Sequence, residues 1–337
     1  MRTAAGRQVI VALGDVEPDL VTGHLPPDAQ FVADPGAEDL HDATGALVRA
    51  DALVDTAMLD QMPNLRVLAR TGVGVERVDV DEATRRGIAV VVTPGAGTHA
   101  VAEGALAIIL HLVKRLRATT ECVAQGRWSD RGAITPGDLE GATIGIVGYG
   151  RIGRRVAHLA RAFGMTVLAH DPYLPPAEDR VGGDGAGGAG GVELVGLEEL
   201  RSRSQVVTLH LPLTPQTRHL VDSAFLAAMP VGSILVNCGR GGLLDLDAAA
   251  HALADGRLAG LGLDVFDPEP PTHHPVFDRT DVVLSPHLMG LSVGATRATF
   301  TAAAQGVADV LAGRRPTALA NPEWDFPDST VPTQEER

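Results

Sequence analysis

Three side chains with the chemistry of an acid–base site lie in the C-terminal half of the chain. Arg240 stands in VNCGRGGLLD, Glu269 in LDVFDPEPP and His287 in LSPHLMG. Each alone is compatible with an ordinary surface or loop residue. Together they indicate more: an imidazole exchanges a proton near neutral pH, a carboxylate orients it, and a guanidinium grips a carboxylate through two parallel hydrogen bonds. The set predicts acid–base chemistry on a substrate that carries a carboxylate.

A second motif, TIGIVGYGRIGRRVAHLARAFGMTVLAHD at 143–171, is a complete dinucleotide fingerprint. Gly148 permits the tight turn after a strand, Gly150 lets backbone approach a pyrophosphate, and Gly153 lets the helix pack on the strand. Free N–H groups at the start of that helix would bind the pyrophosphate. Asp171 would accept a hydrogen bond from the ribose of NAD and repel the 2′-phosphate of NADP. The motif predicts NAD as the cofactor.

The two motifs fit one reaction. A nicotinamide acting on a carbonyl or alcohol needs a proton as well as a hydride, and His287 would exchange that proton. Arg240 would polarise the carbonyl as charge develops on its oxygen.

An alternation of strands and helices must position these residues. Before the fingerprint we expect strands over 9–13, 46–48, 66–69 and 88–92, and helices over 80–86 and 101–117. After it we expect strands over 205–209, 233–237, 260–264 and 282–284, and helices over 222–229, 247–255 and 295–311. Repeated strand–helix–strand units predict doubly wound parallel sheets, which bind ligands at the carboxyl ends of their strands.

Composition limits the possible partners and compartment. The 337 residues suit two domains. A net charge of −14 argues against a nucleic-acid or anionic-membrane partner. Two cysteines, Cys122 and Cys238, give no disulfide framework, and we expect no signal peptide and no membrane span. We therefore expect a cytoplasmic protein.

Three other features are expected to be structural. The glycine-rich segment at 182–191 is typical of a surface loop. Trp128 and Trp324 are expected to anchor packing. His273 and His274 are adjacent and precede a proline, so we expect no metal site.

Beyond the fingerprint, several segments occur in the order typical of one family: NLRVLARTGVGVERVD, VTPGAGTHAVAEGALAIIL, LHLPLTPQTRHL, VNCGRGGLLD, LDVFDPEP and SPHLMG. From about residue 46 to 313 the chain resembles the D-isomer-specific 2-hydroxyacid dehydrogenases, in their 3-phosphoglycerate dehydrogenase-like branch. The resemblance implies two Rossmann-like or flavodoxin-like α/β domains. A substrate-binding domain would comprise 1–97 plus 292–337, with an NAD-binding Rossmann domain over 98–291 inserted into it.

The resemblance also implies an assembly and a length class. A homodimer would form through the NAD-binding domain, with the segment near Gly126–Gly141 reaching across. The sequence resembles a short form without the regulatory domain of longer relatives, so we expect no serine feedback through such a domain.

The resemblance assigns roles to residues by position. Arg240 would clamp the substrate carboxylate and Glu269 would support His287, the acid–base. The cofactor-binding set would be Gly148, Gly150, Arg151, Ile152, Gly153, Asp171, Leu211, Pro212, Cys238, Gly239, Arg240, Asp264, His287 and Gly290. The substrate-binding set would be Arg49, Arg70, Gly72, Val73, Gly74 and Arg240, although Arg70 is also compatible with a solvated loop residue.

Several positions depart from the family pattern. Glu76 and Arg77 stand where Asp-Asn is usual, and Gly97 stands where Asn is common. Gly104 replaces a bulkier residue, and Leu288-Met289 precede Gly290 where smaller residues are frequent. These changes surround the expected substrate pocket, so they leave the substrate open.

The sequence thus predicts an NAD-dependent oxidoreductase. It would transfer a hydride between nicotinamide and C2 of a small D-2-hydroxy acid or 2-keto acid, such as 3-phosphoglycerate, glycerate/hydroxypyruvate or glyoxylate. Two alternatives of the same fold stay open: a phosphite- or formate-type anion dehydrogenase, and an NAD-sensing corepressor-like interaction protein.

Overall fold

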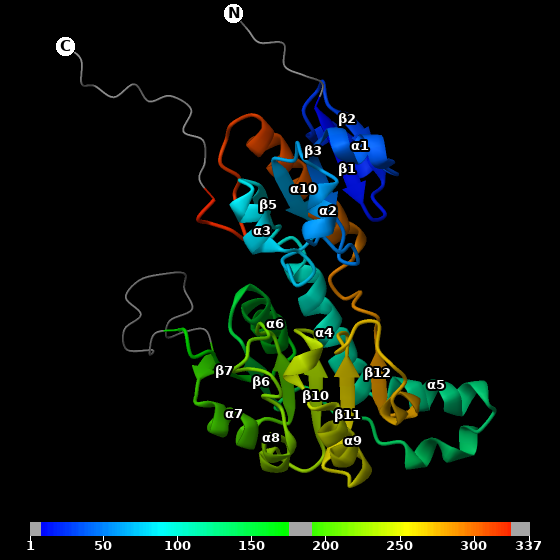
Figure 1. Cartoon of the computed structure of the whole chain (residues 1–337). Helices are drawn as coiled ribbons and strands as arrows, with labels where there is room; N and C mark the ends of the chain where they lie inside the picture. Colours follow the sequence, from blue (N-terminus) through cyan, green and yellow to red (C-terminus); the bar gives the residue numbers. More distant parts are fainter. Residues whose placement is uncertain (1–7, 175–190, 325–337) are drawn as a thin grey trace, which may run out of the picture. The chain divides into compact units, whose positions relative to one another are not determined.

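The chain divides into two compact units, each described here by itself. A computed structural model describes residues 8–174 and 191–324 (Figure 1). One unit is Met1–Gly97 with Val293–Arg337, and the other is Thr98–Ser292. Most of the glycine-rich segment predicted as a loop, 182–190, lies outside the described residues.

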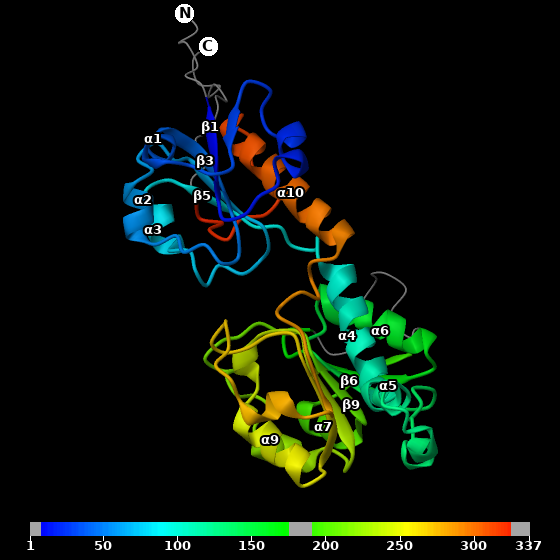
Figure 2. The same cartoon turned by 90° about the vertical axis from the view of Figure 1, so that its right-hand side faces the viewer.

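The first unit is a five-stranded parallel sheet in the order β2-β1-β3-β4-β5. Its strands are β1 (Val9–Leu13), β2 (Gln30–Val32), β3 (Ala43–Val48), β4 (Val67–Arg70) and β5 (Ala89–Val91). Its helices are α1 (Ala37–Asp42), α2 (Thr56–Asp60), α3 (Val80–Arg85) and α10 (Val293–Leu311), with short 3-10 turns η1 (Pro18–Leu20) and η2 (Thr22–His24). Helix α10 covers one face of the sheet and α1–α3 the other (Figure 2), so apolar cores lie on both sides.

The second unit is a seven-stranded parallel sheet in the order β12-β11-β10-β9-β6-β7-β8. Its strands are β6 (Thr143–Val147), β7 (Thr166–His170), β8 (Val192–Leu194), β9 (Val206–Leu209), β10 (Ser233–Asn237), β11 (Leu258–Leu263) and β12 (Val282–Leu284). Its α-helices are α4 (Thr98–Val113), α5 (Leu116–Ala124), α6 (Arg151–Ala162), α7 (Leu197–Arg203), α8 (Ser223–Ala228) and α9 (Leu246–Ala254). Its 3-10 turns include η3 (Trp128–Ala133), η5 (Gly241–Leu243) and η6 (Pro275–Asp278). The strand order reverses between β6 and β9, which is where such sheets bind their ligands.

Helices cover both faces of this second sheet as well. Helices α4 and α6 pack on one face and α7, α8 and α9 on the other (Figure 2). Two glycines of β11 admit α4 closely: a Cβ on Gly262 would collide with Ile108 Cγ2, and one on Gly260 would lie 3.0 Å from Leu112 Cδ2. Helix α4 is therefore held tightly against β11.

These two sheets confirm the predicted fold class, but two local predictions are wrong. The predicted helix over 101–117 ends at Val113, because Arg115 has a φ of 49° and a left-handed residue cannot continue a right-handed helix. Trp128 is 62% exposed and does not anchor a core. Trp324 is buried and donates to the Gly87 carbonyl, as expected of a packing anchor.

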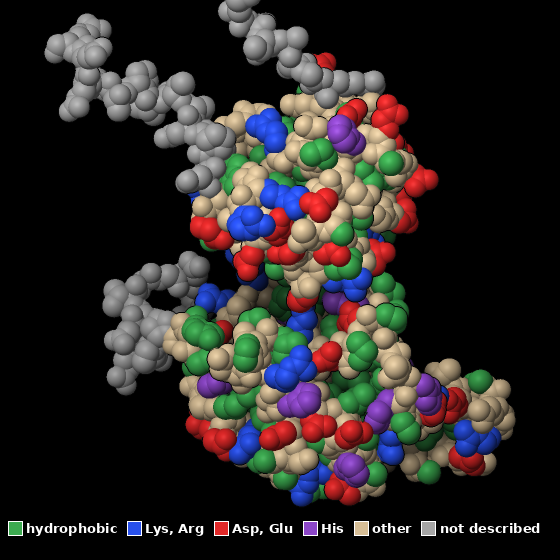
Figure 3. All heavy atoms as spheres, in the orientation of Figure 1, with side chains coloured by type: hydrophobic (Ala, Val, Ile, Leu, Met, Phe, Trp, Pro, Cys, Tyr) green, Lys and Arg blue, Asp and Glu red, His purple; other side chains and the backbone are tan. Residues whose placement is uncertain are grey.

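Charged side chains of both signs are interspersed over the face shown in Figure 3. Within the described ranges, no helix combines the length and apolar character needed to cross a bilayer.

The close packing of α4 on β11 can be tested with Gly262→Ala. The added Cβ would force Ile108 out of its place, and overpacking of this kind costs about 1–3 kcal/mol. We expect a lower midpoint of urea unfolding. The control is Gly294→Ala, because a Cβ at Gly294 would meet nothing within 4 Å; equal effects of the two substitutions would contradict the packing argument.

Candidate active site

His287 and Glu269 form a hydrogen-bonded pair at the carboxyl edge of the second sheet. Nδ1 of His287 lies 2.9 Å from Oε2 of Glu269, and both side chains are partly exposed. The other carboxylate oxygen accepts from Phe266 N at 3.0 Å, which fixes the direction of the carboxylate. His287 has a φ of 57°, rare outside glycine, and its N donates to the Ser285 carbonyl. The surrounding structure must hold this loop in place.

Arg240 lies at the same edge, after the end of β10 and directly before η5. A Cβ on Gly241 would lie 2.5 Å from Asp267 N and would also collide with the carbonyl of Phe266. The backbone beside Arg240 therefore touches the loop that carries Glu269. The Arg218–Asp267 ion pair, at 2.9 Å, ties the same loop further. Nη1 of Arg240 donates to the Gly239 carbonyl at 2.9 Å.

Asp264 holds the loop that carries His287 through hydrogen bonds to the backbone of that loop. It is 2% exposed, and its Oδ1 accepts from Leu288 N at 2.9 Å and its Oδ2 from Met289 N at 3.2 Å. Burial raises the pKa of the Asp264 carboxyl, and these amides and the Ser285 side chain oppose the rise. Burial, and then the nearby Asp264 charge, raises the pKa of the Cys238 thiol to about 12. Cys238 is thus a neutral, unreactive thiol at neutral pH.

The residues of the fingerprint form a cradle that suits a pyrophosphate. Gly148 has a φ of 90°, and a Cβ there would lie 2.5 Å from the His210 carbonyl oxygen. A Cβ on Gly153 would collide with the Gly148 carbonyl. Helix α6 begins at Arg151 after Gly150, with no side chain capping its first N–H groups. The open N–H groups and the absence of side chains fit the predicted NAD.

Asp171 follows β7 and is held by backbone. Its Oδ2 accepts from Tyr149 N at 3.0 Å and its Oδ1 from Tyr173 N at 3.1 Å. This orientation fits the predicted contact with a ribose. The other predicted cofactor positions also follow the carboxyl ends of strands or begin α6: Ile152, Leu211, Pro212, Cys238, Gly239 and Gly290.

The predicted substrate residues of the first unit lie at the carboxyl ends of β3 and β4. Gly72 has a φ of 151°, and Val73 is 55% exposed. The Arg49 guanidinium lies 5.3 Å from the centre of the Phe300 ring. Arg70 is only 5% exposed; its Nε donates to the Gly74 carbonyl at 2.7 Å and its Nη1 to that of Val48 at 3.2 Å. This geometry suits a role in shaping the 72–74 loop rather than the alternative of a solvated residue.

One residue of this edge, His210, was not singled out from the sequence. It follows β9; its Nε2 lies 2.9 Å from Thr208 Oγ1, and its Nδ1 is buried with no hydrogen-bond partner among the described residues. Burial lowers the pKa of His210 to about 4, so the ring is neutral at pH 7. The only available signal was its place in LHLPLTPQTRHL, directly after a strand of the site.

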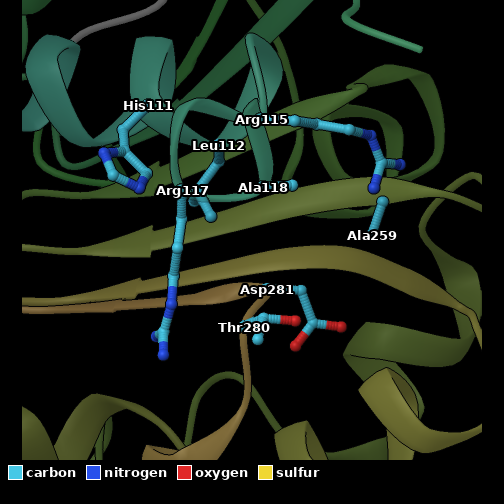
Figure 4. Close-up of a pocket in the computed structure, with 8 residues that line it drawn as sticks. All are labelled: His111, Leu112, Arg115, Arg117, Ala118, Ala259, Thr280 and Asp281. Carbon is cyan, nitrogen blue, oxygen red and sulfur yellow. The ribbon is translucent and has the colours of Figure 1, made fainter. Parts of the chain in front are cut away.

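A small cavity elsewhere in the second unit is not part of this edge. It has a volume of about 60 Å³ and is lined by residues including Arg115, Arg117, Ala259 and Asp281 (Figure 4). Ala259 and Asp281 stand at the amino ends of β11 and β12, opposite the ends that carry the site. The cavity is far below the several hundred Å³ of a typical ligand pocket. No cluster of three potential metal ligands occurs within residues 8–174 and 191–324.

Comparisons with known proteins show which family and which structures the chain is similar to. Residues 106–289 match the family model of the D-isomer specific 2-hydroxyacid dehydrogenase, NAD binding domain. The D-3-phosphoglycerate dehydrogenase of Mycobacterium tuberculosis is 39% identical over 272 residues, covering 81% of this chain and 50% of the relative. The glyoxylate reductase of Thermococcus onnurineus is 33% identical over 292 residues, covering 85% of each. The chain spans about half the length of the phosphoglycerate dehydrogenases it matches.

A solved structure extends the similarity to three dimensions. The D-lactate dehydrogenase of Aquifex aeolicus, complexed with NAD and lactic acid, superposes with a TM-score of 0.75 at 26% identity. The match covers 91% of this chain and 96% of that one.

The neutral state of His210 predicts a loss of stability in acid. Between pH 6.5 and about 4 the unfolded state binds a proton that the folded ring does not, so stability falls as pH falls through this window. The full effect is about 3 kcal/mol. We expect His210→Gln to lose less unfolding free energy than the wild type between pH 6.5 and 4.5, measured in urea. Parallel pH profiles of the two proteins would contradict the assignment.

Proposed function

Because this chain belongs to the D-isomer specific 2-hydroxyacid dehydrogenase family, we propose that it is an NAD-dependent oxidoreductase acting on a small D-2-hydroxy acid or its 2-keto partner. The observation that carries the proposal is the His287–Glu269 hydrogen bond at 2.9 Å, on the same sheet edge as the dinucleotide cradle. When bound, the nicotinamide supplies the redox chemistry at the substrate carbon.

The chain's own residues supply binding and proton transfer. His287 holds the proton that the substrate oxygen gains or loses, with its Nδ1 occupied by Glu269 and its Nε2 left for the substrate. The Glu269 carboxylate, hydrogen-bonded to Nδ1, fixes the orientation of the ring. Arg240 binds the substrate carboxylate and stabilises developing charge on the adjacent oxygen.

The first unit carries substrate-binding residues of its own in this proposal. Backbone N–H groups of Gly72, Val73 and Gly74 receive the substrate carboxylate, in a loop that Arg70 shapes from within. Arg49 provides a positive charge for the distal end of the substrate. A phosphate at that end is one candidate, and a smaller acid such as glyoxylate is another.

A spectrophotometric panel tests the proposal. Loss of NADH absorbance is followed with hydroxypyruvate, glyoxylate, pyruvate and phosphohydroxypyruvate, and NADPH is substituted as the control for the Asp171 preference. Turnover of at least one keto acid with NADH supports the proposal. Tight NADH binding without turnover favours the interaction-protein alternative, and turnover confined to phosphite or formate favours the anion dehydrogenase.

The proposed roles predict large effects of two substitutions. His287→Ala and Arg240→Ala should each lower kcat/KM by about 100-fold or more, because proton transfer and charge stabilisation each contribute that much. The measurement is the steady-state rate with the best acid of the panel. His41→Ala is the matched control, since that histidine is exposed in the first unit. Near wild-type rates for His287→Ala would refute its role.

We also propose a homodimer formed through the NAD-binding domain, in the cytoplasm, where the free thiols of Cys122 and Cys238 stay reduced. Its support is a run of exposed apolar side chains on α5 and η3: Leu116 is 46% exposed, Val123 62% and Trp128 62%. Figure 1 shows α5 extending away from the sheet of its own unit. The Arg131 guanidinium stacks on Trp128 at 5.2 Å.

The proposed interface predicts that Trp128→Ser weakens the dimer. Loss of a buried aromatic side chain at an interface raises the dissociation constant by about 30-fold or more. Sedimentation equilibrium measures that constant. Tyr173→Ser is the matched control, because Tyr173 is an aromatic residue that is 91% exposed outside this segment. A monomeric wild type, or equal dimer strength in both variants, would contradict the proposal.

A further inference from the structure

The side chain of Met289 packs into a notch on helix α4, the space left where Gly104 has no side chain. A Cβ built on Gly104 would lie 2.7 Å from Met289 Cβ and 2.8 Å from its Cγ, and would also collide with Sδ. No residue other than glycine could therefore stand at position 104 with Met289 where it is. The contact to Met289 Cβ matters most, because that atom cannot move without its backbone.

The backbone of the same loop is fixed at a second point. Leu288 N and Met289 N both donate to the buried Asp264 carboxylate. The loop that carries His287 is thus held by its amides on one side and by a single side chain on the other. His287 itself has no such packing: its side chain is 47% exposed and contacts Glu269.

The two contacts that hold the loop, with Gly104 and with Asp264, come from helix α4 and from the end of strand β11, which pack tightly on each other. Gly104, Ile108 and Leu112 follow one another at intervals of four on one face of α4. Ile108 packs over Gly262 and Leu112 over Gly260, in β11. Asp264 follows the last residue of β11. The notch and the carboxylate are consequently parts of one tightly packed helix–strand unit.

We propose that Gly104 and Met289 are a matched pair of positioning residues that hold the His287 loop against α4 and so keep His287 on Glu269. The pair is matched in volume, because the Met289 side chain fills the space that Gly104 leaves by having no side chain. Neither residue is catalytic. The consequence for turnover rests on the proposed function, whereas the anchoring of the loop does not.

Amide exchange tests the anchoring without any reaction. In the full chain without added cofactor, hydrogen–deuterium exchange of the segment 285–291 is followed by mass spectrometry. Gly104→Ala should displace Met289 and accelerate exchange in this segment by about tenfold. The double variant Gly104→Ala/Met289→Gly removes every colliding atom of residue 289, Cβ included, and should bring exchange well below that of Gly104→Ala.

Turnover on the best acid of the panel tests the positioning. Gly104→Ala should lower kcat by about tenfold or more, with KM and the NADH dissociation constant within about twofold, because a small misplacement of an acid–base group slows the reaction without weakening binding. The double variant should recover most of that kcat. Gly260→Ala is the control for strain in the helix: its Cβ would press on Leu112, two turns away from Gly104, so it should lower the melting temperature and change kcat and loop exchange much less than Gly104→Ala does.

Each outcome tests either the Gly104–Met289 pair or the proposed function. Wild-type exchange and kcat in Gly104→Ala, or a double variant no better than the single one, overturns the matched pair. If Gly104→Ala does not fold, Met289→Ala alone decides, since it removes the anchoring side chain without a collision; unchanged exchange in 285–291 then overturns the pair. A wild type that turns over no acid refutes the proposed function, and the exchange experiment still decides the anchoring.

Discussion

The contact between Gly241 and the backbone of Phe266 is the constraint on which the site depends. Arg240 and Glu269 belong to loops that leave neighbouring strands, and a side chain at position 241 would force those loops apart. The carboxyl ends of β10, β11 and β12 can then meet as one polar edge. Glycine serves the same purpose at Gly148, where the fingerprint turn passes against the His210 carbonyl. The site is assembled by close approach of backbones, and side chains add the chemistry.

The charges at this edge are separated by burial. Asp264 is buried, and its carboxylate oxygens accept hydrogen bonds from loop amides, so its role here is structural. His210 is partly buried, with its Nδ1 fully enclosed, and it is neutral, so it adds no competing charge beside the cradle. Glu269 and His287 remain partly exposed, where a substrate can reach them and a proton can be exchanged with solvent. The same edge therefore carries enclosed polar groups, Asp264 and His210, and solvent-accessible ones, Glu269 and His287.

Local sequence predicted the parts of the fold that local physics determines. The apolar runs of β1, β10 and β12 were placed at their observed bounds, and the fingerprint glycines indicated the cradle. The short β2, whose residues are only partly buried, lacks such a run and was missed. The end of α4 was misplaced because nothing in Lys114-Arg115 signals a left-handed residue. The burial of His210 and the bonds of Arg70 depend on tertiary neighbours, so no spacing could have revealed them.

Under the proposed function, reaction type and substrate choice would draw on largely different residues. The acid–base pair and the cradle depend on glycine contacts and on Asp264, all within the second unit. The positions that depart from the family pattern include Glu76 and Arg77 in the first unit, beyond the loop that Arg70 shapes. The proposed Gly104–Met289 pair lies beside the loop that carries His287. Because the Met289 side chain fills the space that Gly104 leaves, a larger residue at position 104 would require a smaller one at position 289.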